Sequence, residues 1–252
     1  MLTACSNDDS ESEQTTTKIE AGKTYYMTVN AKKGGDTRAL TLDGSTMTVT
    51  WDTDENVYVQ YDGSWFTGKL HPTANSNEAW LSGAITPGTS VTLPAAMVTL
   101  QFPRQDFDYT EQDGTLKKIS THYDYATTTA EITGITEDYQ LIASEFVTFQ
   151  NQQAIVKFTL QDEKGDALNV SSLRISATNL KTTDSSTGDI TIQPSSATNV
   201  LFAALSGIED TQVTLTATTT NGTYYVYRKD RVTFADGKYR PITVKMPPSR
   251  MA

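Results

Sequence analysis

The sequence of residues 213–227 alternates apolar or aromatic residues with threonine on both sides of an Asn-Gly pair: Val213-Thr214-Leu215-Thr216-Ala217-Thr218-Thr219, then Asn221-Gly222, then Thr223-Tyr224-Tyr225-Val226-Tyr227. A period of two residues is typical of a half-buried strand, and Asn-Gly between two such runs indicates a tight hairpin. We therefore predict two antiparallel strands joined by a type I′ turn.

The same period recurs from residue 24 to residue 246, whereas helical periodicity is nearly absent. We predict an all-β protein with strands that include residues 24–30, 39–42, 47–51, 57–61, 65–68, 116–125, 154–160 and 238–246. The run 32–38 predicts an exposed linker, and the Thr- and Gly-rich run 126–137 interrupts the strand pattern. Trp51 is expected in the core.

A chain of 252 residues is long enough for two domains that each bury a core. We predict an N-terminal tail at residues 1–23, a first β-sandwich domain at 24–144 and a second at 145–252. The length fits, because a seven-stranded sandwich needs about 100 residues.

The charge balance and the few metal-binding residues exclude several classes of protein. Lysine and arginine number 20 against 30 acidic residues, and the net charge of −10 disfavours a nucleic-acid partner. One cysteine and two histidines cannot form a structural zinc site of the usual composition, so we expect no metal and no cofactor. No apolar run reaches the length of a membrane-spanning helix.

The sequence carries no recognisable catalytic motif. His71 precedes a proline in a loop-like stretch and His122 lies among tyrosines, and neither stands beside a nucleophile motif. We therefore predict a protein that is not an enzyme and has no catalytic residue, with an unrecognised hydrolase as a third and weaker reading.

The acidic clusters are expected to be turns. Asp106/Asp108 and Asp162/Glu163/Asp166 fall in stretches where acids bond their own backbone. The run 52–56 begins like a calcium loop, but valine stands at position 57 where such a loop needs glycine. We predict turns at these places.

Two surface features remain open at this stage. The run Leu2-Thr3-Ala4-Cys5, followed by an acidic, serine-rich stretch, resembles the lipobox of bacterial lipoproteins, which implies lipidation of Cys5; the alternative is an accidental cysteine in a tail. The aromatic residues Trp65, Phe66 and Trp80, with Tyr61, are candidates for a platform that stacks on sugar rings. The alternative for these aromatic residues is packing in the core.

Several segments together resemble the fimbrillin family, the subunits of type V pili and related surface adhesins of gut and oral anaerobes. The resemblance lies in the acidic lipoprotein tail; in Thr37-Arg38-Ala39-Leu40 followed by Trp51, Asp54 and Val57-Tyr58-Val59; in residues 149–160, FQNQQAIVKFTL; and in residues 234–244, FADGKYRPITV. It implies two tandem transthyretin-like, Greek-key sandwiches in a pilus subunit or adhesin at the outer membrane or in the fimbrium.

The family also implies an assembly mechanism. A protease would cut between Arg38 and Ala39, the preceding strand would leave, and a strand of a neighbouring subunit would replace it. The displaced strand is expected to be Thr24, Tyr25, Tyr26, Met27, Thr28, Val29 and Asn30. The expected partners are other pilus subunits, a host or bacterial receptor or glycan, and the outer membrane through the lipid on Cys5. The alternative is that Arg38 is only a solvated linker residue.

The last residues depart from the family pattern. Residues 247–252 read PPSRMA, which is too short and too proline-rich to act as a donor strand. We therefore expect a tip, accessory or non-polymerising protein rather than a shaft subunit. A second functional interpretation is a glycan-binding surface lipoprotein of a nutrient-uptake system.

Overall fold

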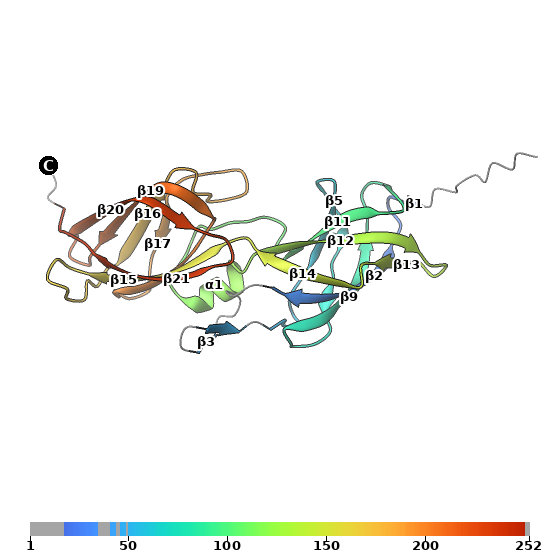
Figure 1. Ribbon diagram of the computed structural model, residues 1–252, viewed down its shortest axis with the longest axis horizontal. Coiled ribbons are helices and arrows are strands. Elements are labelled where there is room, and N and C mark those ends of the chain that lie inside the picture. The colour runs from blue at the N-terminus through green and yellow to red at the C-terminus, as the bar shows by residue number, and fades with distance from the viewer. Residues whose placement is uncertain (1–17, 35–40, 44–45, 49, 250–252) are drawn as a thin grey trace, which may run out of the picture.

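The chain is almost all β in a computed structural model, which describes residues 18–34, 41–43, 46–48 and 50–249. Figure 1 shows an elongated molecule whose strands gather in two groups along the long axis. We call the group with residues 18–34, 50–102 and 126–151 the N-terminal unit, and the group with residues 107–125 and 154–249 the C-terminal unit. The prediction of a β-rich fold is confirmed.

The N-terminal unit is built on one ten-stranded sheet. Its strands are β2 (Tyr25–Lys33), β5 (Tyr58–Tyr61), β6 (Ser64–Trp65), β7 (Thr67–Gly68), β8 (His71–Pro72), β9 (Glu78–Thr86), β11 (Ala96–Phe102), β12 (Ala126–Ile135), β13 (Gln140–Ala143) and β14 (Phe146–Asn151). They follow the order β6-β5-β11-β12-β13-β2-β9-β7, with β14 on β12 and β2, and β8 on β9. Two small ladders pair β1 (Lys18–Ile19) with β10 (Val91–Thr92) and β3 (Thr41–Asp43) with β4 (Thr46–Thr48).

Residues 64–72 join the two ends of this sheet. On one side Trp65 pairs with Gln60 of β5, and on the other side Gly68 pairs with Ile85 of β9. Gly68 has a φ of 92°, and a Cβ there would lie 2.2 Å from a backbone oxygen of β9, so only glycine fits. The strand order therefore forms a closed path, because β6 and β7 at its two ends are joined through residues 64–72. β2 is an interior strand of this sheet and not an edge strand.

The core of the N-terminal unit is centred on three aromatic side chains. Trp51 is 1% exposed, and its ring lies 5.0 Å from that of Phe102 and 5.3 Å from that of Phe149. Aromatic pairs at such separations add to the stabilisation that burial gives. The prediction that Trp51 belongs to the core is confirmed.

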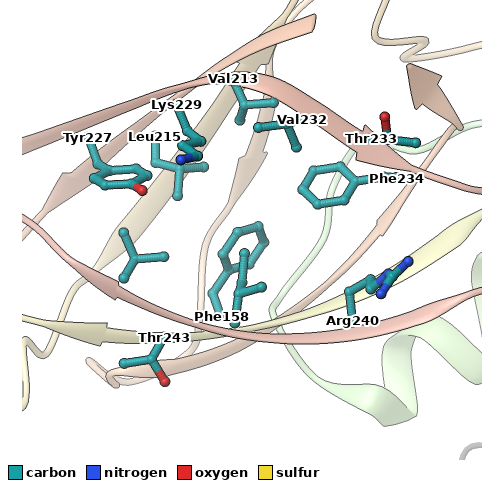
Figure 2. A pocket seen from close by; sticks show the side chains of 12 residues that line it. Phe158, Val213, Leu215, Tyr227, Lys229, Val232, Thr233, Phe234, Arg240 and Thr243 are labelled. Carbon is teal, nitrogen blue, oxygen red and sulfur yellow. The ribbon is translucent and has the colours of Figure 1, made fainter. Parts of the chain in front are cut away.

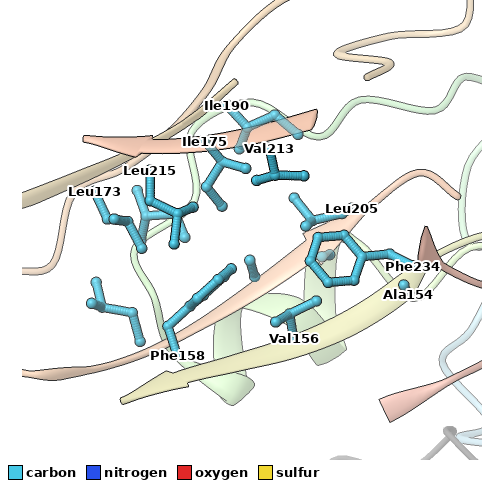
Figure 3. Packing of buried hydrophobic residues seen from close by; sticks show 14 of the residues in the cluster. Ala154, Val156, Phe158, Leu173, Ile175, Ile190, Leu205, Val213, Leu215 and Phe234 are labelled. Carbon is cyan, nitrogen blue, oxygen red and sulfur yellow. The ribbon is translucent and has the colours of Figure 1, made fainter. Parts of the chain in front are cut away.

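The C-terminal unit consists of two sheets that face each other. One sheet has the order β18-β15-β21 and the other β17-β16-β19-β20. The strands are β15 (Ala154–Gln161), β16 (Ser172–Ala177), β17 (Ile190–Ile192), β18 (Val200–Leu205), β19 (Ile208–Thr218), β20 (Tyr224–Phe234) and β21 (Tyr239–Lys245). Figure 3 shows Phe158 of β15 pointing toward Ile175 of β16 and Leu215 of β19, with the core between the sheets.

The two cores interleave along the chain. Tyr109, Ile119, Tyr123 and Tyr125 precede β12 yet pack in the core of the C-terminal unit, whereas β12, β13 and β14 belong to the N-terminal unit. The second domain was expected to begin at residue 145. The chain leaves the core of the N-terminal unit one strand later, at residues 151–154, after β14. Within residues 50–249, all of which the structure describes, the chain passes between the units three times.

Residues 116–125 do not form the expected strand. Leu116–His122 is helix α1, capped by Thr115, whose side-chain oxygen accepts the Lys118 amide at 3.1 Å. Only Ile119 of this helix is buried. The strand prediction was wrong because the helix has no apolar stripe beyond that residue, so its sequence lacks helical periodicity.

Two further expectations concern strand boundaries. β12 continues through residues 126–135, where an interruption was expected, because β11 on one side and β13 and β14 on the other supply its ladder. β2 extends to Lys33, a residue that is only 4% exposed, so the start of the expected exposed linker is a buried strand end.

The predicted hairpin at Asn221-Gly222 exists, but its turn is not type I′. Among the described residues around it, Gly222 has a positive φ of 81° and Asn221 does not. The Gly222 amide donates to the Thr219 carbonyl at 3.0 Å, and the Thr219 amide donates to the Thr223 carbonyl at 3.0 Å. The connection is therefore a type I turn followed by a glycine bulge.

Candidate functional site

Strand β2 is the predicted displaced strand, and it lies between neighbours on both edges. It pairs antiparallel with β9 from Tyr25 to Lys32, and parallel with β13 and β14 on the other edge. Thr24 precedes it and bonds Thr86 through the two hydroxyl groups at 2.9 Å. Tyr25, Met27, Val29 and Ala31 are at most 2% exposed.

The outward face of β2 contacts β9 through polar side chains. The Thr28 and Ser82 hydroxyl oxygens lie 3.1 Å apart, and the Asn30 amide donates to Glu78 at 3.4 Å. Tyr26 on the same face is 52% exposed. The alternation of buried and exposed residues along β2 agrees with the period read from the sequence.

A partly buried ion pair holds the C-terminal end of β2. The Lys33 ammonium donates to a Glu55 carboxylate oxygen and, at 3.0 Å, to the Thr50 carbonyl. It lies 4.7 Å from the centre of the Trp51 ring and 4.9 Å from that of Phe102. We call Thr50, Trp51, Glu55 and Phe102 the cation box. No local sequence pattern predicts the box, because Phe102 and the Lys33 that it holds lie far along the chain from Thr50, Trp51 and Glu55.

The remaining assembly residues lie outside the part of the chain that the structure describes. They are Cys5, the expected lipidation site, and Arg38 and Ala39, the expected cleavage site. Their roles stay predictions. Within the described residues, no helix has the length and apolar character needed to cross a membrane.

The three aromatic residues proposed for sugar stacking do not share an environment. Phe66 is 2% exposed and belongs to the core. Trp65 is half-buried, and its ring lies 6.4 Å from that of Tyr58 in an edge-to-face contact. Trp80 on β9 is 51% exposed. Trp80 therefore offers the largest free ring of the three, and sugar stacking stays a prediction there.

The histidines occupy separate places. His71 lies in β8 and contacts the Glu55 carbonyl at 3.1 Å through Nδ1. His122 ends α1, not a strand, and loss of hydration lowers its pKa, helped by the charge of Lys118. Among the described residues no cluster of three His, Cys, Asp or Glu side chains suits a metal ion.

The acidic turns bond their own backbone, as predicted. Asp162 Oδ1 accepts the amides of Lys164 and Asp166, both at 2.9 Å. Asp108 Oδ1 accepts the Thr110 amide at 2.8 Å. The Asp54 amide donates to Asp52 Oδ1 at 3.0 Å in the turn that the calcium-like run forms.

An apolar slot opens between β20 and β21, which are consecutive in sequence but belong to different sheets. Figure 2 shows Phe158 between the two strands, with Tyr227 and Lys229 on the β20 side and Arg240 on the β21 side. The cavity holds about 310 Å³. No local pattern in the sequence predicts this cavity, because it forms only where two successive strands enter different sheets.

The slot is closed at both ends by the chain itself. At one end Pro248 bridges to Tyr225, and the Ser249 amide donates to the Tyr224 carbonyl at 2.8 Å. At the other end residues 235–238 turn from β20 into β21. In that turn, burial raises the pKa of the Asp236 carboxyl, opposed by the hydrogen bond from the Gly207 amide.

Comparison with known proteins identifies the fold. No family model and no curated protein matches the chain. Among solved structures, a candidate cell adhesion protein from Bacteroides ovatus superposes with a TM-score of 0.50 at 10% identity, over 91% of this chain and 96% of that one. The chain shares that fold.

Two other solved structures are similar over most of their length. A candidate cell adhesion protein from Bacteroides uniformis has a TM-score of 0.45 at 12% identity, with 89% of this chain and 96% of that chain covered. A fimbrial assembly protein from Parabacteroides distasonis has a TM-score of 0.44 at 12% identity, with 88% and 91% covered. At such identities the likeness concerns the fold alone.

Proposed function

We propose that the chain is a non-enzymatic subunit of a cell-surface adhesin or pilus, built from two tandem transthyretin-like sandwiches. Its precursor is held in the outer membrane by a lipid on Cys5, is cut after Arg38 and joins a neighbouring subunit by donor-strand exchange. The observation that supports this proposal best is the position of β2. It is the last described strand before the segment with Arg38, and it fills a groove between β9 and β13/β14.

The energetics favour exchange over simple release. Burial of each large side chain of β2, such as Tyr25, Met27 or Val29, contributes roughly 1.5–3 kcal/mol. Loss of the strand would also leave unpaired backbone groups along β9 and β14, which is the kind of edge that another strand completes. A cut chain therefore keeps β2 until a strand of equal apolar content replaces it.

A reversible lock on β2 tests the proposal. Thr28 lies directly opposite Ser82, and their hydroxyl oxygens are 3.1 Å apart. The Tyr26 amide donates to Tyr139 across the other edge, so the even-numbered residues of β2 turn their backbone groups away from β9. Thr28 and Ser82 thus form a non-hydrogen-bonded pair, whose short Cα separation suits a disulfide.

The experiment uses the full chain with Cys5→Ser, with and without the pair Thr28→Cys and Ser82→Cys. Limited trypsin digestion is followed until the new N-terminus reads Ala39-Leu40, and a fluorescent peptide with the sequence of residues 18–34 is added. We expect the unlocked protein to take up the peptide, and the locked protein to do so only after reduction. Equal uptake by the oxidised locked protein, or no uptake by the unlocked one, would contradict strand exchange.

The lipid anchor has a separate test in cells. Replacement of Cys5 with serine is expected to leave the protein in the periplasm, because no acyl chain then holds it to the bilayer. Unchanged membrane association of this variant, measured after cell fractionation, would refute the anchor.

A further inference from the structure

We propose that the strand which replaces β2 is selected at its C-terminal end by the cation box, which requires a lysine followed by a glycine in the incoming strand. This inference rests on the proposed strand exchange and names the chemistry of the partner. The partner strand alternates four apolar residues with polar ones, as β2 does, and then presents a primary ammonium to Glu55, Trp51 and Phe102.

The contacts of Lys33 define what the box recognises. Its side chain is 3% exposed, and its ammonium meets the Glu55 carboxylate, the Thr50 carbonyl and the faces of two aromatic rings. A carboxylate and ring faces together favour a cation over any neutral group. Lys32, the neighbouring residue on the same strand, is exposed and does not enter the box.

Most of the box is positioned by residues outside β2. The second Glu55 carboxylate oxygen accepts the Asp52 amide at 3.0 Å, and the Trp51 amide donates to the Ser76 carbonyl at 2.7 Å. Of the three hydrogen bonds that position Glu55 and Trp51 here, the one from the Trp51 indole to the Ala31 carbonyl, at 3.0 Å, depends on β2, and any incoming backbone supplies such a carbonyl. The box therefore keeps its chemistry when strands exchange.

An incoming strand without the cation leaves the Glu55 carboxylate, whose side chain is 21% exposed, without its charged partner. Removal of one partner of a buried ion pair costs far more than the pair itself contributes, because the remaining charge has lost its water. The box also fixes the register, since a slip by one residue would place the ammonium on the outer face and the apolar residues in water.

The residue after the lysine meets a second requirement. A Cβ on Gly34 would lie 2.4 Å from the Phe149 carbonyl oxygen and 2.5 Å from Thr148 Cγ2. The first of these atoms is backbone of β14, so it cannot move without disturbing that strand. A side chain at this place therefore keeps the lysine from reaching the box.

The test uses the trypsin-cut full chain with Cys5→Ser and competing peptides of residues 18–34. We expect a peptide with Lys33→Met to bind roughly 100-fold more weakly than the native peptide, and the matched peptide with Lys32→Met to bind within about threefold of it. A peptide with Gly34→Ala is also expected to bind more weakly. Equal binding of the Lys33→Met and Lys32→Met peptides would overturn the inference while leaving strand exchange in place.

Two further measurements separate the outcomes. In protein with Glu55→Gln, the preference for the native over the Lys33→Met peptide is expected to shrink at least tenfold, because the anion of the box is gone. If no peptide enters the cut protein, strand exchange itself fails. Urea unfolding of the uncut chain then still tests the box, since Lys33→Met must destabilise more than Lys32→Met, and equal effects would overturn cation recognition.

Discussion

In the N-terminal unit the two end strands of the sheet are joined to each other, whereas in the C-terminal unit two strands, β20 and β21, each have an unpaired edge. In the first, residues 64–72 close the path of strands, and β2 is bonded on both sides. In the second, as far as the described residues show, β20 pairs with β19 alone apart from the bridge at Tyr225, and β21 pairs with β15 alone. The slot of about 310 Å³ lies between these two strands.

The difference shows which parts of the molecule oppose pairing with a strand of another polypeptide. The open edges carry features that discourage pairing: the charged run Arg228-Lys229-Asp230-Arg231, and Pro241 in β21. The Ile155 amide donates to Lys238 and the Met246 amide to Gln161, so Pro241 turns its missing donor to the free edge. The groove of β2 has no such protection, because β2 itself covers it.

Removal of the Trp51 ring should produce the largest effect. Trp51→Ala deletes a buried ring that packs on Phe102 and Phe149 and donates to the β2 backbone. We expect the free energy of unfolding in urea to fall by about 3–5 kcal/mol. The matched change Trp80→Ala, on an exposed ring of the same unit, should cost less than about 0.5 kcal/mol. Similar losses from both would mean that the core is not centred on Trp51.

Proline in the doubly paired strand β2 and at the free edge of β21 sharpens the comparison directly. Lys32→Pro removes an amide that faces β14, and we expect a loss of about 1–3 kcal/mol because a ladder acceptor stays unpaired. Thr243→Pro removes an amide at the free edge of β21 and should change stability by less than about 0.5 kcal/mol. Chemical denaturation of both variants provides the measurement. A loss from Thr243→Pro as large as that from Lys32→Pro would show that the β21 edge is not free.

In β20, Asp230 and Arg231 lie opposite the single residue Gln212 of β19 and so form a bulge, which predicts a small gain in stability. Arg231 has a φ of 55°, where a side chain costs about 1–2 kcal/mol. Arg231→Gly relieves this strain but adds about 0.5–1 kcal/mol of chain entropy, so we expect a net gain of about 0.5 kcal/mol in thermal or urea unfolding. Arg228→Gly, in the regular part of the strand, should instead destabilise. Loss of stability in both variants would argue against strain at Arg231.

The smallest expected effect is a change in pH dependence. Because burial raises the Asp236 pKa above its usual value of 3.8, the folded state binds this proton more tightly than the unfolded state does. This group therefore lowers stability as pH rises from 3.8 through its folded pKa. Asp236→Asn should flatten that fall and leave a small gain at pH 7, measured by unfolding at several pH values. A profile unaffected by Asp236→Asn would contradict the shift.

Much of the strand pattern follows from the sequence alone. Residues 25–31 alternate apolar and polar side chains, and Trp51 stands among other strand formers, so their burial is predictable from local chemistry. Asp62-Gly63 joins the paired strands β5 and β6 with positive φ at both residues, which is the conformation that an Asp-Gly pair between two alternating runs favours.

The features that sequence analysis missed depend on partners far away in the chain. The Thr-rich run of β12 gains its ladder only from β11, β13 and β14. The local sequence predicts that Lys33 is a solvated linker residue, because its contacts with Glu55 and Trp51 form only in the folded protein. The slot exists because β20 and β21 separate into two sheets, which no short window of sequence records.

The three passages of the chain between the units have a mechanical consequence. They run through residues 102–107, 125–126 and 151–154, and the Gln152 amide bonds the Tyr125 carbonyl at 3.0 Å where two of them meet. A tension that pulls one unit away from the other is shared by three stretches of backbone instead of one. The molecule is therefore suited to carry tensile load along its long axis without separation of the two units.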